Sequence, residues 1–200
     1  MTEPKRTVYF TTENKNKFLE AARIASSFQV NLKHLNWKKL EIQSQSLTEI
    51  ASFAAREAAQ STRKVVVAED AGFFVQGLGG FPGPYSSYIF DTLGNAGILR
   101  LMRNVQNRRA SFQAAVAYCE PNQRPISFTG SVRGSLAWRP RGLHGFGFDP
   151  IFLPRQGDGR TFAQMSMNEK NLSSHRAKAF TKFCKWYALI DSRNRLRQVK

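Results

Sequence analysis

The stretch Val65 to Asp70 constrains this chain most, because a run of four apolar residues ends in two adjacent carboxylates, Glu69 and Asp70. Such a short unbroken run predicts a strand inside a sheet, here over residues 65–68. Ligands of open α/β sheets bind at the carboxyl ends of the strands, so these carboxylates are well placed for a site. They can hold Mg²⁺ through oxygen ligands, and one can act as the base for a water molecule. The alternative is an ordinary loop start whose charges lie in water.

The charge of the chain is strongly basic and unevenly distributed. The chain has 30 Lys and Arg against 14 Asp and Glu, a formal net charge of +16. Residues 1–70 contribute +3 to this charge and residues 71–200 contribute +13. This balance favours anionic partners such as nucleic acid, nucleotides or an anionic membrane, although a general basic bias in composition explains it about as well.

The length and the remaining composition indicate one domain over residues 1–200. No segment reaches the roughly 18 continuous apolar residues that a membrane span needs, and the first residues lack the apolar core of a signal peptide. The two cysteines, Cys119 and Cys184, are far apart and have no metal-ligand spacing. We therefore expect a cytoplasmic protein with reduced thiols and no membrane partner.

The first 70 residues predict three strands separated by two helices. Phe18, Ala21 and Ala25 recur at helical spacing, and a later Ala-rich segment is amphipathic. The predicted order is a strand at 6–11, a helix at 14–28, a strand at 30–35, a helix at 47–60 and the strand at 65–68. Strands that alternate with helices in this way are typical of an α/β core.

The second part of the chain predicts further elements between two loops rich in Gly and Pro. These loops are 77–84 and 139–150. Helices are expected at 92–103 and 173–189, with a frayed charged tail after them, and strands at 110–119 and 125–138. The two strands have only a turn between them, which predicts an antiparallel pair.

The junction between the first strand and the first helix, Thr12 to Lys17, is a candidate phosphate site. Backbone N–H groups and the positive end of a helix attract anions at such a point. Thr12 and Asn14 add short hydrogen-bonding groups, and Lys17 adds a charge one turn into the helix. Capping residues and surface lysines are common, so an ordinary capped helix fits the same residues. A Walker motif, GxxxxGK[ST], does not occur.

Two further segments carry groups suited to a nucleotide. Phe146 and Phe148, flanked by glycines, can stack a base, although they fit a hydrophobic plug equally well. The segment 169–176 is expected to open the last long helix, so Lys170, His175 and Arg176 place cations where the helix dipole disfavours them. An anionic or carbonyl-bearing ligand explains this placement, and so do side chains that extend into solvent.

Seven stretches in order resemble the inosine triphosphate pyrophosphatase (HAM1-like) family, whose members remove deaminated purine nucleotides. The stretches are TENKNK at 12–17, AEDAG at 68–72, GFPGPYS at 80–86, PRG at 140–142, GFGFDPIF at 145–152, TFAQM at 161–165, and EKN with SHRA within 169–177. One such motif would be weak evidence. Seven in the family's order, over nearly the whole chain, are highly specific.

The resemblance implies a fold and a reaction. The fold is mixed α/β, with an elongated central sheet and two lobes flanking a nucleotide-binding cleft, usually in a homodimer. The reaction is Mg²⁺-dependent hydrolysis of ITP, dITP or XTP between the α- and β-phosphates. It yields the monophosphate and pyrophosphate, and so keeps non-canonical purines out of nucleic acid.

The resemblance also implies roles for individual residues. Mg²⁺ would be held by Glu41, Glu69 and Asp70, and Asp70 would be the catalytic residue that activates water. The triphosphate would lie on Thr12, Asn14 and Lys17. The full set expected to bind substrate is Thr12, Asn14, Lys17, Ala71, Phe146, Gly147, Phe148, Asp149, Lys170, His175 and Arg176.

Within that set, the resemblance divides base recognition from phosphate binding. Lys170 would take the remaining phosphate charge, and Phe146 would stack the purine. Asp149, His175 and Arg176 would read the edge of the base. Hypoxanthine and xanthine present an acceptor at O6 where adenine presents an amino donor, so donors aimed at O6 would disfavour adenine.

Three positions depart from the family's pattern. Many relatives carry a lysine where Ala54 aligns and a cation where Ser87 aligns, so two phosphate-binding cations are missing or replaced. Glu41 aligns only with a gap of one residue. Two alternatives to the implied function stay open: a basic α/β module that binds RNA or DNA, which we do not favour, and a related pyrophosphatase with another base preference.

Overall fold

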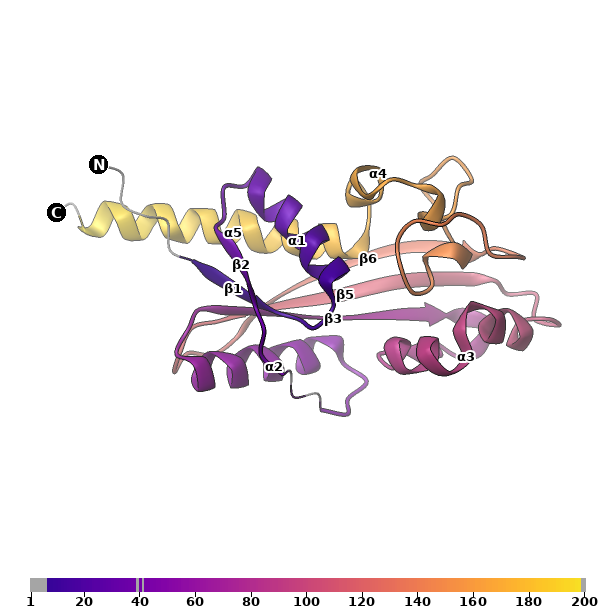
Figure 1. Ribbon diagram of the computed structural model, residues 1–200, viewed down its shortest axis with the longest axis horizontal. Helices are drawn as coiled ribbons and strands as arrows, with labels where there is room; N and C mark the ends of the chain where they lie inside the picture. The colour runs from indigo at the N-terminus through magenta and orange to yellow at the C-terminus, as the bar shows by residue number, and fades with distance from the viewer. Residues whose placement is uncertain (1–6, 39, 41, 199–200) are drawn as a thin grey trace.

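The computed structural model of the protein describes residues 7–38, 40 and 42–198, and their side chains as far as Ile190. It is a mixed α/β structure in which helices cover both faces of an elongated seven-stranded sheet (Figure 1). The strands are β1 (Val8–Thr11), β2 (Leu32–Leu35), β3 (Val66–Val75), β4 (Pro82–Gly83), β5 (Arg109–Cys119), β6 (Ile126–Leu136) and β7 (Phe152–Pro154). The helices are α1 (Lys15–Ser27), α2 (Leu47–Thr62), α3 (Ser86–Leu101), α4 (Met167–Asn171) and α5 (His175–Gln198), with 3₁₀ turns η1 (Gln76–Leu78), η2 (Asp149–Ile151) and η3 (Phe162–Gln164). The predicted fold class is therefore confirmed.

The sheet combines a short parallel part with a long antiparallel part. The strand order is β2-β1-β3-β5-β6-β7, and β4 pairs separately with β3. β1 runs parallel to both β2 and β3, whereas β3, β5, β6 and β7 pair antiparallel in that order. The predicted antiparallel pair corresponds to β5 and β6. Among the residues described, none of the helices has the length and apolar character of a membrane span.

Three apolar clusters fill the space between the sheet and its helices. In Figure 1, α1 and α5 lie on one face of the sheet and α2 and α3 on the other. α5 packs on the sheet through aromatic residues such as Phe180, whose ring contacts Phe10 of β1, and α1 packs in the same cluster. α2 packs through a row of fully buried alanines. The third cluster lies around Phe73 and Phe112, where α3 meets the segments that carry η2 and η3.

Two predicted boundaries were wrong because long-range pairing extends the elements. The strand expected at 65–68 runs on to Val75, since β5 pairs with it residue for residue as far as Ala110. Helix α3 begins at Ser86, six residues before the expected start, and is kinked at Gly94, whose φ of 61° and ψ of −169° are not helical. The expected helix corresponds mainly to the part after the kink, and the part before it begins where the Ser86 hydroxyl accepts the Phe73 N–H at 2.7 Å. A local sequence window contains neither contact.

The segment expected to open one long helix forms two helices instead. Lys170 lies in the last turn of the short helix α4, where the helix dipole favours a cation. His175 and Arg176 begin α5, and the Ser174 hydroxyl accepts the Ala177 N–H at 3.1 Å. α5 then continues to Gln198, so the backbone helix does not end near Leu189 as expected.

Gly130 on β6 allows the first turn of α5 to approach the sheet. A Cβ atom at this position would lie 2.2 Å from the His175 carbonyl oxygen and 2.6 Å from the Ala179 amide nitrogen. We expect Gly130→Ala to lower the free energy of unfolding by about 1–3 kcal/mol, because two backbone atoms must move to make room. Chemical denaturation measures this loss. Ser131→Ala, at the exposed neighbouring position, should cost under about 0.5 kcal/mol, and an equal loss in both variants would contradict the packing argument.

Candidate active site

A cavity of about 650 Å³ opens at the edge of β3, between the helices of the two sheet faces. β1 pairs with β3 only as far as Ala68, and β4 pairs with it from Phe73 onward. The four intervening residues, 69–72, all line the cavity. The other lining residues are Thr12, Glu13, Asn14, Lys17, Pro84, Ser86, Ser87, Phe90, Asp91, Phe112, Phe146, Gly147, Phe148, Asp149, Lys170, His175 and Arg176. The interval between two short partner strands thus forms the floor of the cavity.

Glu69 and Asp70 lie within β3 instead of after its end, but both face the cavity. Successive side chains of a strand point to opposite faces, so the two carboxylates diverge. Glu69 points toward α5, with its Oε1 atom 3.0 Å from Arg176 Nε. Asp70 therefore points toward the α2 and α3 side. They are 3% and 8% exposed, so each carboxylate is nearly removed from bulk water.

The start of α1 brings the predicted phosphate-binding residues to the same cavity. Asn14 caps the helix, because its Oδ1 atom accepts the Lys17 N–H at 3.1 Å, and the Thr12 hydroxyl accepts the Asn14 N–H at 3.2 Å. The Lys17 amine lies 3.5 Å from Glu69 Oε2. The structure thus brings Thr12, Asn14 and Lys17 together with Glu69, as the sequence predicted, while Asn14 and Thr12 also perform the capping that was the alternative.

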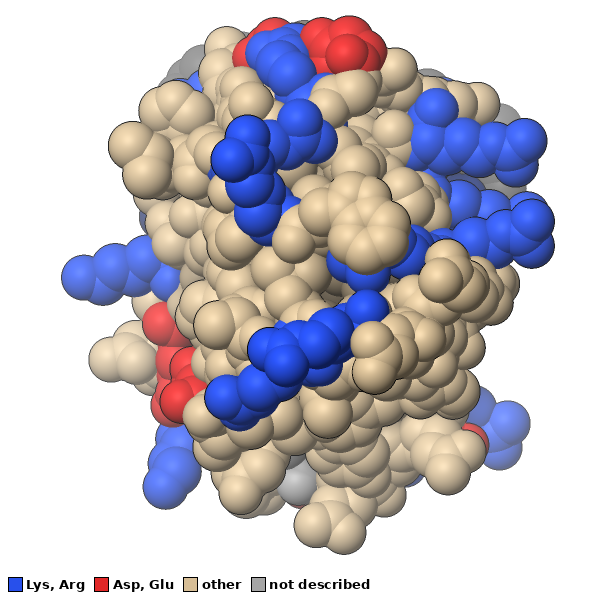
Figure 2. All heavy atoms as spheres, turned by 90° about the vertical axis from the view of Figure 1, so that its right-hand side faces the viewer, with Lys and Arg blue, Asp and Glu red and all other residues tan. Residues whose placement is uncertain are grey.

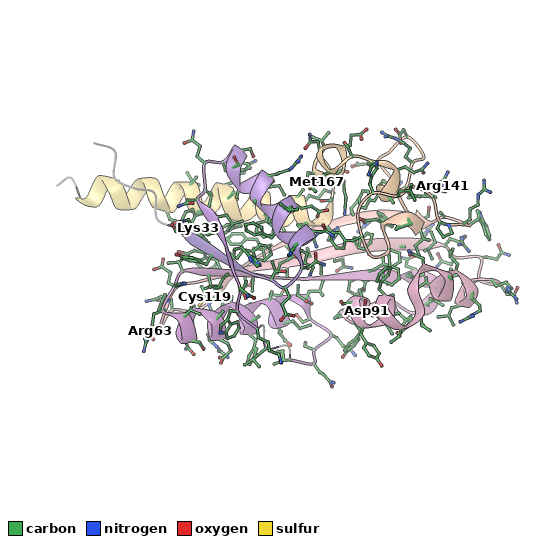
Figure 3. The ribbon with its side chains drawn as sticks, viewed as in Figure 1. Lys33, Arg63, Asp91, Cys119, Arg141 and Met167 are labelled. Carbon is green, nitrogen blue, oxygen red and sulfur yellow. The ribbon has the colours of Figure 1, made fainter. Side chains whose placement is uncertain are left out.

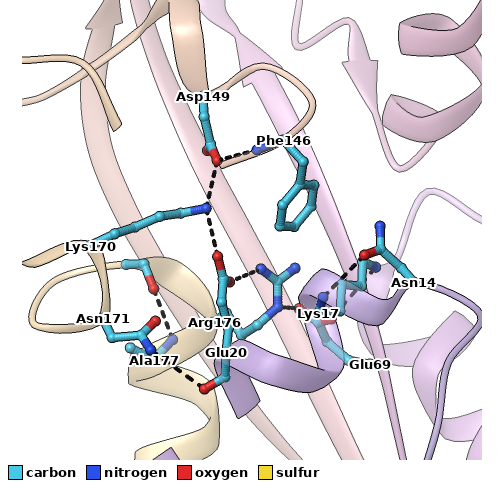
Figure 4. Close-up of polar contacts among 11 residues, drawn as sticks. Asn14, Lys17, Glu20, Glu69, Phe146, Asp149, Lys170, Asn171, Arg176 and Ala177 are labelled. Carbon is cyan, nitrogen blue, oxygen red and sulfur yellow. Dashed lines mark hydrogen bonds and ion pairs between the residues drawn. The ribbon is translucent and has the colours of Figure 1, made fainter. Parts of the chain in front are cut away.

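A buried ion network connects the two ends of the cavity (Figure 4). Glu20 of α1 lies at its centre and accepts from Lys170 Nζ at 2.9 Å and from Arg176 Nη1. Arg176 also forms an ion pair with Glu69, and Lys170 Nζ donates to Asp149 Oδ2 at 2.6 Å. Glu20, Asp149, Lys170 and Arg176 are each at most 3% exposed. Charges this deep are stable only while all are paired.

The pKa values of the network follow from burial and pairing. Burial alone would raise the pKa of Glu20, but the charges and hydrogen bonds of Arg176 and Lys170 lower it below its usual value. Burial opposes the charge of Arg176, yet Glu69 and Glu20 raise its pKa above the ordinary value. Burial raises the pKa of Asp149 despite the charge of Lys170. Glu20 and Arg176 therefore hold a full charge at neutral pH.

Glu20 is the functional residue that sequence reasoning missed. A signal was present, because Glu20 directly precedes Ala21 on the face of α1 that also buries Ile24 and Ala25. A carboxylate within an apolar helix face requires a buried cation. The partners, Lys170 and Arg176, lie about 150 residues further along the chain, so the sequence did not indicate them.

The glycine-rich loop forms the opposite wall of the cavity. The Phe146 N–H donates to Asp149 Oδ2 at 2.9 Å, and the Gly147 carbonyl accepts from Asn95 Nδ2 of α3 at 3.2 Å. The Phe146 ring is partly exposed, with Lys170 Nζ 4.8 Å from its centroid. Lys170 therefore lies beside the predicted base-binding residues, and its expected contact with phosphates stays a prediction.

Phe148 and Asp149 are more deeply buried than a direct contact with a base requires. Phe148 is 3% exposed and stacks on Phe73 at 5.1 Å between centroids, so it forms the hydrophobic plug that the sequence left open as an alternative. Asp149 accepts hydrogen bonds from the Phe146 N–H and from Lys170 Nζ. Both residues line the cavity, and their contacts fix the shape of the loop, while their expected role in binding the substrate stays a prediction.

His175 is a buried, neutral imidazole at the cavity wall. Its ring stacks on Phe112 with the centroids 4.8 Å apart and the planes 11° apart. Burial, with the charges of Arg176 and Lys170, holds the pKa of His175 well below its usual value. Its Nδ1 atom has no hydrogen-bond partner among the residues described, so a ligand or a water molecule can decide which ring nitrogen carries the proton.

The two positions that depart from the family's pattern differ in their surroundings. Ala54 is fully buried in the apolar cluster beneath α2. Ser87 is exposed in the first turn of α3 and lines the cavity. The amino ends of α1, α3 and α5 therefore all reach one cavity. Their helix dipoles supply positive potential at the cavity, where many relatives carry cations in place of Ala54 and Ser87.

The structure provides few metal ligands by itself. Glu41, the third predicted ligand, lies outside the described residues. Over residues 7–38, 40 and 42–198, no group of three His, Cys, Asp or Glu side chains is arranged to hold a metal ion. Glu69 and Asp70 offer hard oxygen donors, and Mg²⁺ commonly binds through one or two carboxylates plus substrate phosphates. The donor set therefore fits Mg²⁺ bound together with an anionic ligand.

Together, the fold and the cavity define a class of protein. A cleft at the edge of an α/β sheet, with helix amino ends at one wall and a partly exposed aromatic ring at the other, is typical of nucleotide-binding proteins. Within that class, the chain belongs to the Ham1 family, since the sequence model of that family matches residues 8–186. The resemblance stated from the motifs is thereby confirmed.

Individual relatives agree with this assignment. The chain is 47% identical over 180 residues to the dITP/XTP pyrophosphatase of Methanopyrus kandleri, covering 90% of this chain and 95% of that protein. It is 44% identical over 181 residues to the dITP/XTP pyrophosphatase of Hyperthermus butylicus, covering 90% and 94%. A HAM1 protein from Coxiella burnetii superposes with a TM-score of 0.81 at 26% identity, covering 91% of this chain and 98% of that one.

Removing the charge of Glu20 should destabilise the protein strongly. We expect Glu20→Gln to lower the free energy of unfolding by about 3–5 kcal/mol, because Lys170 and Arg176 stay buried without their shared counter-charge. Chemical denaturation tests this. The matched control is Glu57→Gln, which breaks an ion pair with Arg56 at 3.8 Å on the surface and should cost under about 1 kcal/mol. Similar costs for both variants would show that the buried network is not the source of stability.

Proposed function

We propose that this protein hydrolyses ITP, dITP and XTP to the monophosphate and pyrophosphate. The observation that carries the proposal is the meeting of Asp70, the amino end of α1 and Phe146 in one cavity. The high identity to dITP/XTP pyrophosphatases supports the same reaction. Its effect would be to keep deaminated purines out of nucleic acid.

The triphosphate would lie at the amino end of α1. Thr12, Asn14 and Lys17 line that wall, and Lys17 is the cation there whose side chain is 21% exposed. A helix amino end and a lysine together stabilise phosphate oxygens. The first turn of α3, which includes Ser87, would accept the phosphate charge that relatives place on a cation.

Mg²⁺ would be held by Asp70 and Glu69 together with the substrate, and we retain Glu41 as a proposed third ligand. When bound, Mg²⁺ would neutralise phosphate oxygens and orient the phosphorus for attack. Glu69 also faces Arg176 and Lys17, which would keep its carboxylate oriented.

Asp70 would act as the general base. Its carboxylate would accept a proton from the attacking water as the bond between the α-phosphorus and the bridging oxygen breaks, with pyrophosphate leaving. A positioned carboxylate typically contributes about 10²–10⁴-fold to such a step. Lys17 and the amino end of α1 would stabilise the negative charge of the leaving group.

The base would stack on Phe146, with Gly147 of the same loop and Ala71 of β3 also lining the cavity. His175, neutral at pH 7, would donate its N–H toward O6, and Arg176 would contribute through its position beside Phe146, 5.4 Å from the ring centroid. Adenine offers an amino group at that position. Pairing donor against donor leaves buried groups unsatisfied, at a cost of about 1–3 kcal/mol for each group.

We also propose that residues 1–200 form one catalytic domain, in which the cavity separates two lobes. A homodimer is supported by exposed apolar side chains near the start of α3, including Tyr85 and Tyr88, which are 47% and 69% exposed. A cytoplasmic setting is supported by Cys119 and Cys184, which are both free and buried.

Pyrophosphate release with Mg²⁺ tests the proposed reaction. ITP, dITP and XTP should be hydrolysed at least tenfold faster than ATP at equal concentration, since one unsatisfied buried group costs about 1–3 kcal/mol. Modified pyrimidine triphosphates in the same panel test a different base preference. Equal activity on ATP would contradict the proposed specificity.

Asp70→Asn tests the assigned base. We expect a loss of about 10²-fold or more in kcat, while calorimetry with ITP shows binding within about tenfold of the wild type, because the phosphate and base contacts remain. Asp91→Asn is the matched control, because Asp91 is an exposed carboxylate of α3 in the same cavity lining. Turnover at the wild-type rate in Asp70→Asn would refute the role.

A further inference from the structure

An arginine-rich surface covers the end of the molecule opposite the chain termini. Figure 2 looks onto this end, where basic side chains spread across the face and acidic ones lie toward its margins. We define the arginine surface as Arg100, Arg103, Arg109, Arg133, Arg139, Arg141 and Arg155, with Trp138 among them. Arg141, one of its members, lies at this end in Figure 3, whereas Arg63 lies at the other. We propose that this surface binds single-stranded nucleic acid.

The choice of residues favours phosphate as the ligand. All ten basic residues between positions 71 and 169 are arginine, and none is lysine. Residues 92–148 contain a single carboxylate, Glu120. The planar guanidinium group binds phosphate through two parallel hydrogen bonds and stacks on flat rings, which the lysine amine does not do. If these basic residues served only to keep the protein soluble, lysine would serve as well as arginine, and the exclusive use of arginine would have no explanation.

Contacts join the separate segments into one surface. Arg108, directly before β5, donates from Nη1 to the Met102 carbonyl at 3.4 Å, which ties the start of β5 to the end of α3 that carries Arg100 and Arg103. Arg109 of β5 lies opposite Ser135 of β6, two residues from Arg133 on the same face of the sheet. The Arg155 N–H donates to the Arg133 carbonyl at 2.9 Å. The end of α3, the start of β5, the end of β6 and the chain after β7 thus contribute to a continuous face.

The charges of this surface are not neutralised within the protein. None of its seven arginines forms an ion pair with a carboxylate in the part of the chain that the structure describes. Arg160, just outside the surface, provides the contrast, because it pairs with Asp158 at 2.7 Å and with Glu169 at 2.8 Å. Arg141 is half-buried and donates to the Gly159 carbonyl at 3.1 Å, but a carbonyl carries no net charge that would neutralise it. Cations without a paired carboxylate can bind an external polyanion.

Trp138 gives the surface a means to contact bases. Its side chain is 73% exposed, and the Arg108 guanidinium lies 4.0 Å from its ring. Arg108 is fixed by the carbonyls of Met102, Leu136 and Ala137, to which its three guanidinium nitrogens donate. A rigid cation therefore supports one exposed indole ring, as in proteins that stack successive bases of a single strand.

The aromatic ring distinguishes between anionic partners. A duplex keeps its bases stacked inside, and a lipid headgroup has no ring to stack, so neither uses Trp138 in this way. The arginines of the surface are absent from the lining of the catalytic cavity. Binding at this end should therefore leave hydrolysis of ITP unchanged, and the inference does not depend on the proposed catalytic roles.

Fluorescence anisotropy with labelled oligo(U) and oligo(dT) of about 15 nucleotides tests the proposal across a range of salt concentrations. We expect log Kd to rise with log salt at a slope near 3 if about four phosphates are contacted. Arg109→Gln with Arg133→Gln should weaken binding at least tenfold and reduce the slope by about 1.4, since two phosphate contacts are removed. Trp138→Ala should weaken single-strand binding about tenfold while duplex binding stays unchanged.

The matched control removes the same charge elsewhere. Arg63 and Arg124 are exposed, and neither belongs to the arginine surface, so their double replacement by Gln should weaken binding less than threefold. Circular dichroism spectra and thermal unfolding midpoints that match the wild type show that the variants fold. Equal losses in the two double variants would overturn the proposal, as would preferential binding to phosphatidylserine vesicles or duplex. An unchanged affinity of Trp138→Ala for a single strand would overturn base stacking and with it the choice of partner.

Discussion

The buried ion network around Glu20 is the constraint on which the rest of the site depends. Each charge taken out of water costs several kcal/mol, which only a complete set of partners can offset. The partners come from α1, β3, η2, α4 and α5. These elements must therefore assemble together, and the position of the Phe146 loop is coupled to the position of the Glu69 carboxylate.

The cavity itself results from an incomplete edge of the sheet. Two short strands pair with the same edge of β3 and leave four residues between them, which include both carboxylates. Strand alternation then directs Glu69 into the ion network and Asp70 toward α3. One strand thus serves two tasks: Glu69 helps to hold the fold together, and both carboxylates line the cavity in which a ligand would bind.

The net positive charge of the chain has little to do with this cavity. Lys17, Lys170 and Arg176 are matched by Glu20, Glu69 and Asp149, and Asp70 adds a further negative charge. The surplus lies largely elsewhere, including the arginine surface at the far end. The net charge of the whole chain therefore combines two regions with different electrostatics. It indicated an anionic partner without showing where that partner would bind.

The sequence alone determined the α/β class, most elements and the residues near the cavity, because hydrophobic periodicity and short motifs are local properties. It even placed Thr12, Asn14 and Asp70 in one site. The tertiary structure decided the length of β3, the early start of α3, the division of α4 from α5 and the partners of Glu20. Each of these depends on hydrogen bonds or ion pairs between distant residues, such as Glu20 with Arg176. Such contacts have no local pattern, so the fold had to bring the residues together before their roles became visible.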